Sequence, residues 1–224
     1  MLLTYFAHAS FKLSTNGVDV IFDPYASGAF NGMVGYSPIN ESADIVLVSH
    51  QHEDHNAVQE VLENPKVIDI PFTGKEGPLS IESFVSFHDE KKGLERGENI
   101  VFIVKGDVSG ITLAHLGDQG CVDRELAKRM QSVDVLLIPI GGTYTLSPET
   151  ATEFINLLAG PKLIIPMHYK TDKIEFPIQP LSAFLDLNQD KKKIKFGKPE
   201  VTLEDYAGKD GDKSSILILP MARL

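Results

Sequence analysis

The sequence has little cysteine and no long apolar run. Its one cysteine, Cys121, excludes an intrachain disulfide framework and fits a reducing compartment, so we expect a cytoplasmic protein. No apolar run approaches the roughly 18–20 residues that a membrane-spanning helix needs, and no membrane partner is expected. The opening MLLTYFAHASFKL lacks both a basic start and an uninterrupted apolar stretch. We therefore interpret it as part of the folded protein and not as a signal peptide.

Basic residues are in the minority. The 21 Lys and Arg residues face 31 Asp and Glu residues, which gives a formal net charge of −10. The only dense basic run, at 191–193, is interpreted as a solvated turn before a strand. Proteins that bind nucleic acid usually carry a basic patch, so no nucleic-acid partner is expected. Bound cations would reverse the charge locally, and the net charge therefore does not decide the sign of a small substrate.

Short apolar runs with a β-strand pattern dominate the sequence. Hydrophobic residues make up 42% of the chain, which suffices for a sizeable core. The pattern of apolar residues predicts strands at 2–6, 10–14, 18–22, 44–49, 66–70, 81–87, 99–105, 110–115, 133–140, 162–168, 194–196, 201–204 and 215–219. Helices are predicted at about 54–63, 122–131, 147–160 and 178–188, the third with Ser147 as its N-cap and Pro148 at its first position. Two segments, 25–38 and 207–214, are predicted loops, the second one mobile. No linker interrupts the chain, so we expect one domain over 1–224, with two packed sheets and outer helices.

The densest chemical signal is the stretch LVSHQHEDHNAV at 47–58. The strand before it is predicted to end at Ser49, and His50 and His52 are spaced to point the same way as the chain leaves the strand. Asp54 and His55 are predicted to open the following helix. Imidazoles and a carboxylate that converge suit Zn²⁺, Mn²⁺, Fe²⁺ or Ni²⁺. A solvated helix start with chance histidines is disfavoured, because imidazolium is unfavourable at a helix N-terminus.

One short segment cannot close a metal site, so later polar residues at strand ends matter. His88 ends SFVSFH, Asp118 lies in ITLAHLGD, and His168 ends LIIPMH. A lone histidine at a strand end is more often structural than a ligand. Three such positions beside the dense motif favour ligation, and we expect their side chains to meet it.

These residues, in this order, resemble the metallo-β-lactamase superfamily of metal-dependent hydrolases, whose signature HQHEDH at 50–55 matches. The stretches FHDEKKGLERGEN, HLGDQG, IPIGGTYT and IPMHY are similar to the branch related to L-ascorbate-6-phosphate lactonase. The resemblance implies an α/β fold, an αββα four-layer sandwich of two mixed sheets flanked by helices. It also implies two divalent metal ions, with zinc as the first choice and Mn, Ni or Fe as alternatives. The implied ligands are His50, His52 and His88 for one ion and Asp54, His55 and His168 for the other, with Asp118 bridging the two.

Other residues have less specific signals. Asp23, in VIFDPY, matches the early aspartate that supports the metal loop in the superfamily, although an Asp-Pro turn after a strand would also place it there. His115 is predicted to support the site from behind the ligands, with direct ligation as the alternative. His8, Tyr144 and Tyr169 are candidates for substrate contact at the site mouth, and an ordinary turn or rim position is the alternative for each.

The resemblance implies a hydrolase in which a metal-bound hydroxide opens an ester or lactone while Asp54 transfers a proton. The predicted substrate is a small molecule, selected by the loops 25–38, 89–98 and 170–180. Basic residues of these loops could meet a phosphate, although a solvated surface position is favoured for each of them: Lys91, Lys92, Arg96, Lys170 and Lys173. The alternatives are a metal-dependent phosphodiesterase or nuclease, and a non-hydrolytic metal-binding or redox protein. Self-association into a homo-oligomer is left open.

Overall fold

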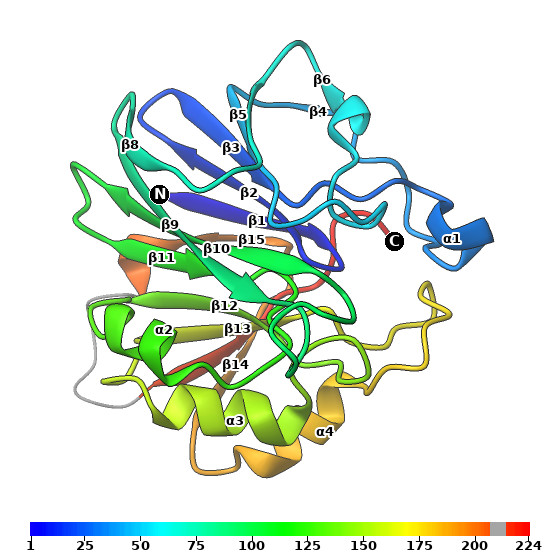
Figure 1. The fold of residues 1–224 in the computed structure, drawn as a ribbon. Coiled ribbons are helices and arrows are strands. Elements are labelled where there is room, and N and C mark those ends of the chain that lie inside the picture. Colours follow the sequence, from blue (N-terminus) through cyan, green and yellow to red (C-terminus); the bar gives the residue numbers. More distant parts are fainter. Residues whose placement is uncertain (207–213) are drawn as a thin grey trace.

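Two mixed sheets face each other in the computed structural model, which describes residues 1–206 and 214–224 (Figure 1). The smaller has the strand order β15-β1-β2-β3-β5-β7, and the larger has the order β14-β16-β13-β12-β11-β10-β9-β8. The predicted loop 207–214 lies outside the described residues except for its last residue. None of the described helices is long and apolar enough to cross a membrane.

Most strands follow the predicted runs, whereas the strands at 41–42, 61–62 and 73–76 were not predicted. The smaller sheet contains β1 (Leu2–Ala7), β2 (Ser10–Thr15), β3 (Val18–Phe22), β5 (Ile45–Leu47), β7 (Lys66–Ile68) and β15 (Glu200–Thr202). The larger sheet contains β8 (Thr73–Glu76), β9 (Leu79–Phe87), β10 (Glu98–Gly106), β11 (Thr112–His115), β12 (Val135–Pro139), β13 (Leu163–Met167), β14 (Lys192–Lys195) and β16 (Ser215–Ile218). A third, two-stranded sheet pairs β4 (Glu41–Ser42) with β6 (Val61–Leu62).

The core has three apolar layers, because successive side chains of a strand point to opposite faces. In β3, Val20 and Phe22 lie in the layer between the two sheets, whereas Ile21 lies in the layer outside the smaller sheet. In β12, Leu137 belongs to the layer between the sheets, and Leu136 belongs to the layer beneath the helices. Both faces of both sheets are therefore covered.

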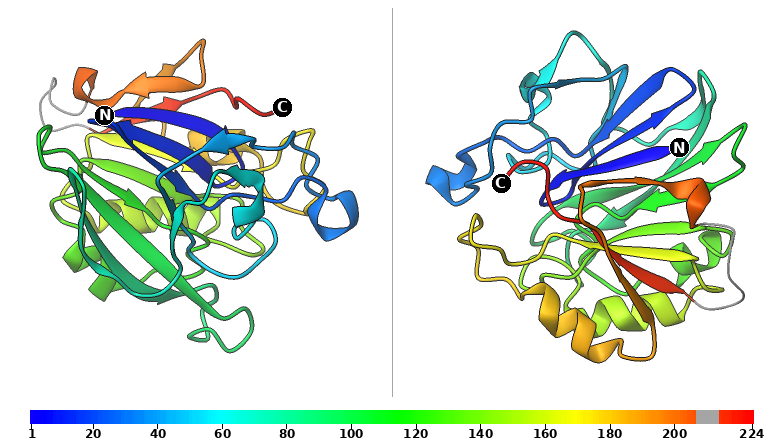
Figure 2. Two further views of the ribbon diagram at one scale, coloured as in Figure 1. Left: turned by 90° about the horizontal axis from the view of Figure 1, so that it is seen from above. Right: turned by 180° about the vertical axis from the view of Figure 1, so that it is seen from behind.

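The two outer layers differ. Helices α2 (Arg124–Arg129), α3 (Pro148–Asn156) and α4 (Leu181–Leu187) pack on the outer face of the larger sheet (Figures 1 and 2). The outer face of the smaller sheet is covered mainly by the irregular segment 24–43, which contains the short turn α1 (Ala29–Gly32). The predicted α/β sandwich of two mixed sheets is thus confirmed, with few helices and one outer layer built mostly from coil. The predicted start of α3 is also confirmed, since Ser147 caps it and Pro148 is its first residue.

The predicted helix at 54–63 is wrong. His52 to Asn56 form a turn, followed by the 3₁₀ segment η1 (Val58–Glu60) and by β6. Tertiary contacts override the local preference here: the Ala57 amide donates to the Pro24 carbonyl, and β6 pairs with β4. The β-branched Val58 and Val61 add little helix propensity against these contacts.

Strand direction brings the polar segments to one edge. β3 and β5 are parallel, and so are β11, β12 and β13. β1 runs in the same sense as β3 because both are antiparallel to β2, and β9 runs with β11 because both are antiparallel to β10. The carboxyl ends of these strands therefore lie at shared edges, where ligand sites of α/β folds form.

Candidate metal centre

Seven buried or half-buried side chains form two groups of potential metal ligands. His50, His52 and His88 make one group, whose ligand atoms all lie within 4.8 Å of one another. The second group, at the same spacing, contains His8, Asp54, His55 and His168. These groups match the two ligand sets implied by the resemblance, with His8 added. A third combination, of Asp23, His50 and His55, is less suited to a cation because Asp23 already accepts hydrogen bonds from its neighbours.

Asp118 lies between the two groups. Its Oδ2 is 3.2 Å from His88 Nε2, 3.5 Å from His168 Nε2 and 3.8 Å from His50 Nε2. Its Oδ1 is 3.2 Å from His55 Nε2. A carboxylate that contacts histidines of both groups has the position that a bridging ligand requires. Among the described residues, its backbone amide is held by Asn99 Oδ1 at 2.9 Å.

Hydrogen bonds behind the histidines select their tautomers. Asp23 accepts from the Ser49 amide at 2.7 Å and from Ser49 Oγ at 2.6 Å, so this hydroxyl in turn accepts from His50 Nδ1 at 2.9 Å. His55 Nδ1 donates to Asp23 Oδ2 at 2.9 Å, and His88 Nδ1 donates to the Tyr144 carbonyl at 2.9 Å. In the neutral form of each ring Nδ1 carries the proton outward, which leaves the Nε2 lone pair facing the site.

The site contains buried polar atoms that no protein group satisfies. His50 Nε2, His55 Nε2 and Asp118 Oδ1 make no hydrogen bond to any described residue. Native proteins rarely bury such atoms unpaired, because each one costs about 1–3 kcal/mol. These atoms are metal-ligand types that face one another, so the donor set fits divalent cations such as zinc.

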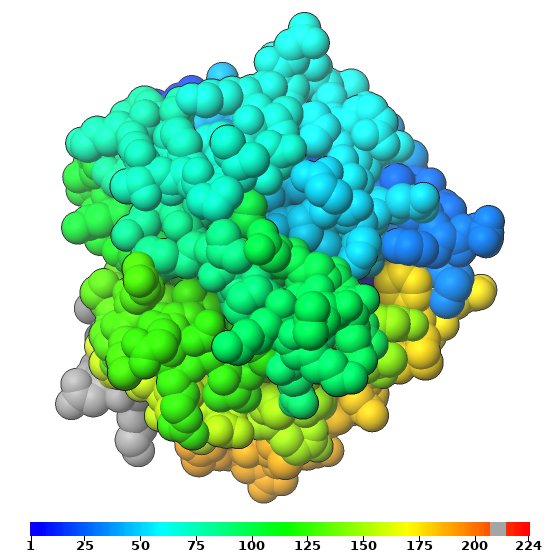
Figure 3. Space-filling view, viewed as in Figure 1, coloured from blue at the N-terminus to red at the C-terminus, as the bar shows by residue number. Residues whose placement is uncertain are grey.

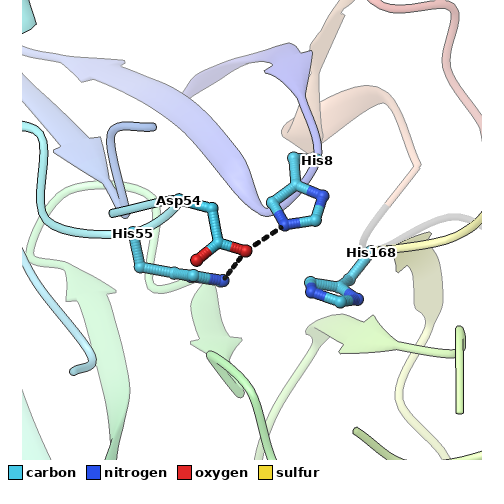
Figure 4. A group of neighbouring side chains, drawn as sticks. All are labelled: His8, Asp54, His55 and His168. Atoms are coloured by element: carbon cyan, nitrogen blue, oxygen red, sulfur yellow. Dashed lines mark hydrogen bonds and ion pairs between the residues drawn. The ribbon is translucent and has the colours of Figure 1, made fainter. Parts of the chain in front are cut away.

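His8 lies inside the second group and not at the mouth of the site, where the sequence suggested it. Its Nε2 donates to Asp54 Oδ2 at 2.9 Å, and its ring centroid is 4.1 Å from that of His168 (Figure 4). The His8 carbonyl accepts from the His168 amide at 2.9 Å and from Tyr5 Oη at 2.9 Å. The turn after β1 is thereby tied to the turn after β13, and His8 orients the Asp54 carboxylate.

Backbone geometry at the site is unusual. His8, Asp23 and His168 have φ values of 57°, 41° and 51°, in the left-handed region, which costs about 1–3 kcal/mol for a residue with a side chain. Two glycines permit the close packing of the turns: a Cβ on Gly117 would lie 2.5 Å from Ser49 Cβ, and one on Gly120 would lie 2.3 Å from the His88 carbonyl. The tertiary contacts therefore hold the ligand turns in place against local preference.

The charges of the site favour cation binding. Burial lowers the pKa of His50 and of His168 to about 3, so both rings are neutral ligands at physiological pH. Burial raises the pKa of Asp118, but the neighbouring His168 and His55 outweigh it and hold that pKa well below its usual range. Burial lowers the pKa of His55, but Asp118 and Asp54 outweigh it and raise that pKa well above its usual value. A proton therefore competes with a cation for His55 Nε2, which lies 3.2 Å from Asp118 Oδ1.

Metal uptake is accordingly expected to release protons. Against the effect of burial, Asp118 raises the pKa values of both His55 and His88, so zinc binding at pH 7 should release a number of protons set by these two rings, and the zinc affinity should fall as the pH falls. Calorimetric titration of the metal-free protein with zinc, in buffers of different ionisation enthalpy, measures this number. Binding enthalpies that do not change with the buffer would contradict the raised pKa values of these rings.

A cavity of about 300 Å³ opens above the ligands. His52, Asp54, His88, Asp118 and His168 form its metal-ligand side, and the other lining residues are Phe30, Met33, Arg96, Tyr144 and Phe176. The Arg96 guanidinium lies over the Tyr144 ring, with its carbon 5.6 Å from the ring centroid. The predicted position of Tyr144 beside the site therefore agrees with the structure.

Three further candidates lie elsewhere. Tyr169 is 8% exposed, packs in the core layer beneath the helices and does not line the cavity, so its placement argues against the predicted substrate contact. His115 is fully buried, donates from Nε2 to the Ala9 carbonyl at 2.8 Å and accepts from the Gly117 amide, which is a supporting position behind the ligands. Lys170 Nζ donates to the Ile174 and Phe176 carbonyls, so it braces a loop and is not available to a phosphate.

Several residues that shape the site gave no signal in the sequence. Ser49 and Asn99 are ordinary polar residues until the fold places one between Asp23 and His50 and the other beside Asp118. The apolar lining residues Phe30, Met33 and Phe176 belong to predicted loops, where an apolar residue is easily taken for a packing contact. The sequence indicated only the loops that carry these residues, 25–38 and 170–180, and not the residues themselves.

The chain is similar in sequence to metal-dependent hydrolases. Residues 2–168 match a family model described as a β-lactamase superfamily domain. A UPF0173 metal-dependent hydrolase of Carboxydothermus hydrogenoformans is 31% identical over 198 residues, which cover 76% of this chain and 85% of that protein. Another UPF0173 metal-dependent hydrolase, from Methanopyrus kandleri, is 29% identical over 201 residues, with the same coverage of 76% and 85%.

Solved structures show the same similarity. A candidate Zn-dependent hydrolase of the metallo-β-lactamase superfamily from Thermotoga maritima superposes with a TM-score of 0.74 and 33% identity, and the match covers 97% of each chain. A metallo hydrolase from Ignicoccus hospitalis superposes with a TM-score of 0.59 and 22% identity over 84% of this chain and 90% of that one, and shows the shared fold alone.

Proposed function

This chain belongs to the UPF0173 metal-dependent hydrolases of the metallo-β-lactamase superfamily, and we propose that the bond it hydrolyses is a carboxylic ester closed as a lactone. The observation that carries the proposal is the arrangement of two His/Asp ligand groups, joined by Asp118, beneath a small and mostly apolar cavity. Such a cavity suits a compact acyl compound. Its volume corresponds to about ten water molecules at roughly 30 Å³ each.

We propose two zinc ions as the resident metals. His50, His52 and His88 would hold one, and Asp54, His55 and His168 would hold the other, with Asp118 between them. When bound, the metals supply Lewis acidity and a water whose pKa is lowered toward about 7. Within this chain, Asp54 lines the cavity and is oriented by His8, so it can accept the proton of the attacking water and return it to the leaving oxygen.

The cavity favours an ester over a phosphodiester of nucleic acid. Arg96 is the only Lys or Arg among the described residues that line the cavity, whereas a nucleic-acid backbone is usually bound by several cations. The chain as a whole is acidic. The small cavity and the single arginine therefore support a small-molecule substrate.

Metal removal and reloading provide the test. Stripping the metals with a chelator should lower lactone hydrolysis by about a thousandfold or more, and zinc should restore it, because such ions contribute several kcal/mol to catalysis. The measurement is the hydrolysis rate on a γ-lactone and on bis-p-nitrophenyl phosphate, together with metal content and an absorption spectrum. Turnover of the phosphodiester without lactone turnover would overturn the proposed reaction, and iron absorption bands without hydrolysis would indicate redox chemistry instead.

A further inference from the structure

Beyond the ligand side chains, the lining of the cavity is mainly apolar and aromatic. Phe30 and Met33 come from the segment around α1, and Phe176 comes from the segment 170–178. The ring centroid of Phe176 is 5.5 Å from that of Phe30 and 5.7 Å from that of Tyr144, so these aromatic rings form one continuous surface. Part of this surface is open to solvent, because Phe30 is 37% exposed. A row of rings that is incompletely covered by protein can bury a hydrocarbon group of a ligand.

Backbone contacts hold the two segments of this wall together. The Gly35 amide donates to the Lys173 carbonyl at 2.7 Å, and the Glu175 amide donates to the Met33 carbonyl at 2.9 Å. Val34 and Ile174 form an antiparallel bridge between these bonds. The ribbons of α1 and of the yellow segment 170–178 come close at one side of the molecule, and the space-filling view shows the same segments in adjacent positions (Figures 1 and 3). Backbone hydrogen bonds therefore hold the apolar residues of this wall in fixed positions.

One cation lies at the Tyr144 end of this aromatic surface. Arg96 belongs to the loop between β9 and β10, and the amides of Lys91, Gly93, Glu95 and Arg96 all donate to the Asp89 carboxylate at 2.7–3.0 Å. This loop geometry presents the Arg96 side chain against Tyr144. Its one ion-pair partner in the described residues is Glu95, at the long distance of 4.0 Å. The guanidinium therefore retains donors for an anion.

The lining also offers little to a sugar-like ligand. Apart from the metal-ligand residues, Arg96 and Tyr144 are the only lining residues with polar side chains, and no Ser, Thr, Asn or Gln lines the described cavity. The hydroxyls of a polyhydroxylated lactone would lose their hydrogen bonds to water there without finding partners, which weakens the binding of such a ligand.

Resting on the proposed function, we infer that the substrate is an amphipathic anion: a small ester whose hydrocarbon part packs on Phe30, Met33 and Phe176 and whose carboxylate or phosphate binds Arg96. The same groups exclude polyhydroxylated lactones. Arg96 acts in this scheme as a specificity-determining residue, and the bond that breaks lies over the His/Asp ligands.

Calorimetric binding to the zinc-loaded protein tests this inference without turnover. The probes are hexanoate, hexyl phosphate, acetate and 1-hexanol, and the proteins are the wild type, Arg96→Gln, Arg96→Lys and Phe176→Ala. Arg96→Gln should lower the affinity for the two six-carbon anions about tenfold or more and leave the affinity for 1-hexanol unchanged, as expected for a lost charge-assisted hydrogen bond. Arg96→Lys should restore part of this loss. Phe176→Ala should lower the affinity for hexanoate more than the affinity for acetate. The anion that binds more tightly to the wild type, hexanoate or hexyl phosphate, identifies the anionic group of the substrate.

The matched control is Lys92→Gln, which removes the same charge from an exposed position of the same loop and should change no affinity. Equal hexanoate affinity in the wild type and in Arg96→Gln would show that the metals alone bind the carboxylate and would overturn the inference. A polyhydroxylated γ-lactone that is hydrolysed faster than an alkyl γ-lactone would also overturn it. Arg96-dependent binding without any lactone turnover would instead overturn the proposed reaction and leave the ligand class standing.

Discussion

Asp118→Asn is expected to abolish hydrolysis and to lower the metal content of the purified protein. The Asp118 carboxylate contacts histidines of both ligand groups, at distances of 3.2 to 3.8 Å. The amide has nearly the same shape but no charge, so two cations would repel each other across it. Because loss of a supporting partner alone costs 10- to 100-fold in metal affinity, we expect at least about 100-fold here, and a fall in turnover of about a thousandfold or more.

The fold should survive this substitution. The backbone of Asp118 remains held by Asn99, and the close approach of Gly117 to Ser49 does not involve the altered group. Metal analysis, turnover and circular dichroism should be compared with Asp186→Asn, which makes the same change at an exposed position of α4. Two tightly bound zinc ions in Asp118→Asn would show that this carboxylate does not bridge them.

Asp54→Ala is expected to abolish turnover while the fold persists. Asp54 lines the cavity, contacts His55 Nε2 at 3.6 Å and accepts the hydrogen bond from His8, so its loss removes both a ligand and the proposed proton acceptor. General acid–base groups contribute about 10²- to 10⁴-fold to a rate, and the lost ligand adds to that. The measurement is kcat per zinc-containing site, which separates the loss of proton transfer from the loss of metal.

The matched control for Asp54→Ala is Asp69→Ala. Asp69 is an exposed carboxylate near the site, whose contact is with Gln51 at 3.3 Å, and its removal should leave turnover unchanged. Normal turnover in an Asp54→Ala protein with verified metal content would exclude the proposed role of Asp54.

The strands and the order of candidate ligands were readable from the sequence because both are local signals. A buried strand appears as a short apolar run, and His50, His88 and His168 each follow such a run directly. Since the relevant strands share a direction within each sheet, residues at their carboxyl ends meet at one edge once the fold class is given. The α/β sandwich could therefore be predicted together with the group of residues around its edge.

The errors arose where long-range contacts outweighed local preference. The segment 54–63 has the composition of a helix, yet its pairing with β4 and with the Pro24 carbonyl forms a turn, a 3₁₀ segment and a short strand. Tyr169 follows His168 directly, yet its side chain enters the core. Lys170 is charged, yet loop carbonyls bind its ammonium group. In each case neighbours distant in the chain determine where the side chain lies.

The sequence by itself determined which chemistry the protein can perform, because His, Asp and the apolar runs before them are properties of single short segments. Only the tertiary structure decided which atoms of those residues face the site. The tautomer of His55 depends on Asp23, which lies 32 residues earlier in the chain. The tautomer of His50 depends on Ser49, whose hydroxyl is oriented by the same Asp23, 26 residues before it. It also decided the shape of the cavity. Phe30 and Phe176 become neighbours through hydrogen bonds between two separate segments, and Arg96 reaches the same cavity by lying over Tyr144. Such pairings carry no pattern that a single segment displays.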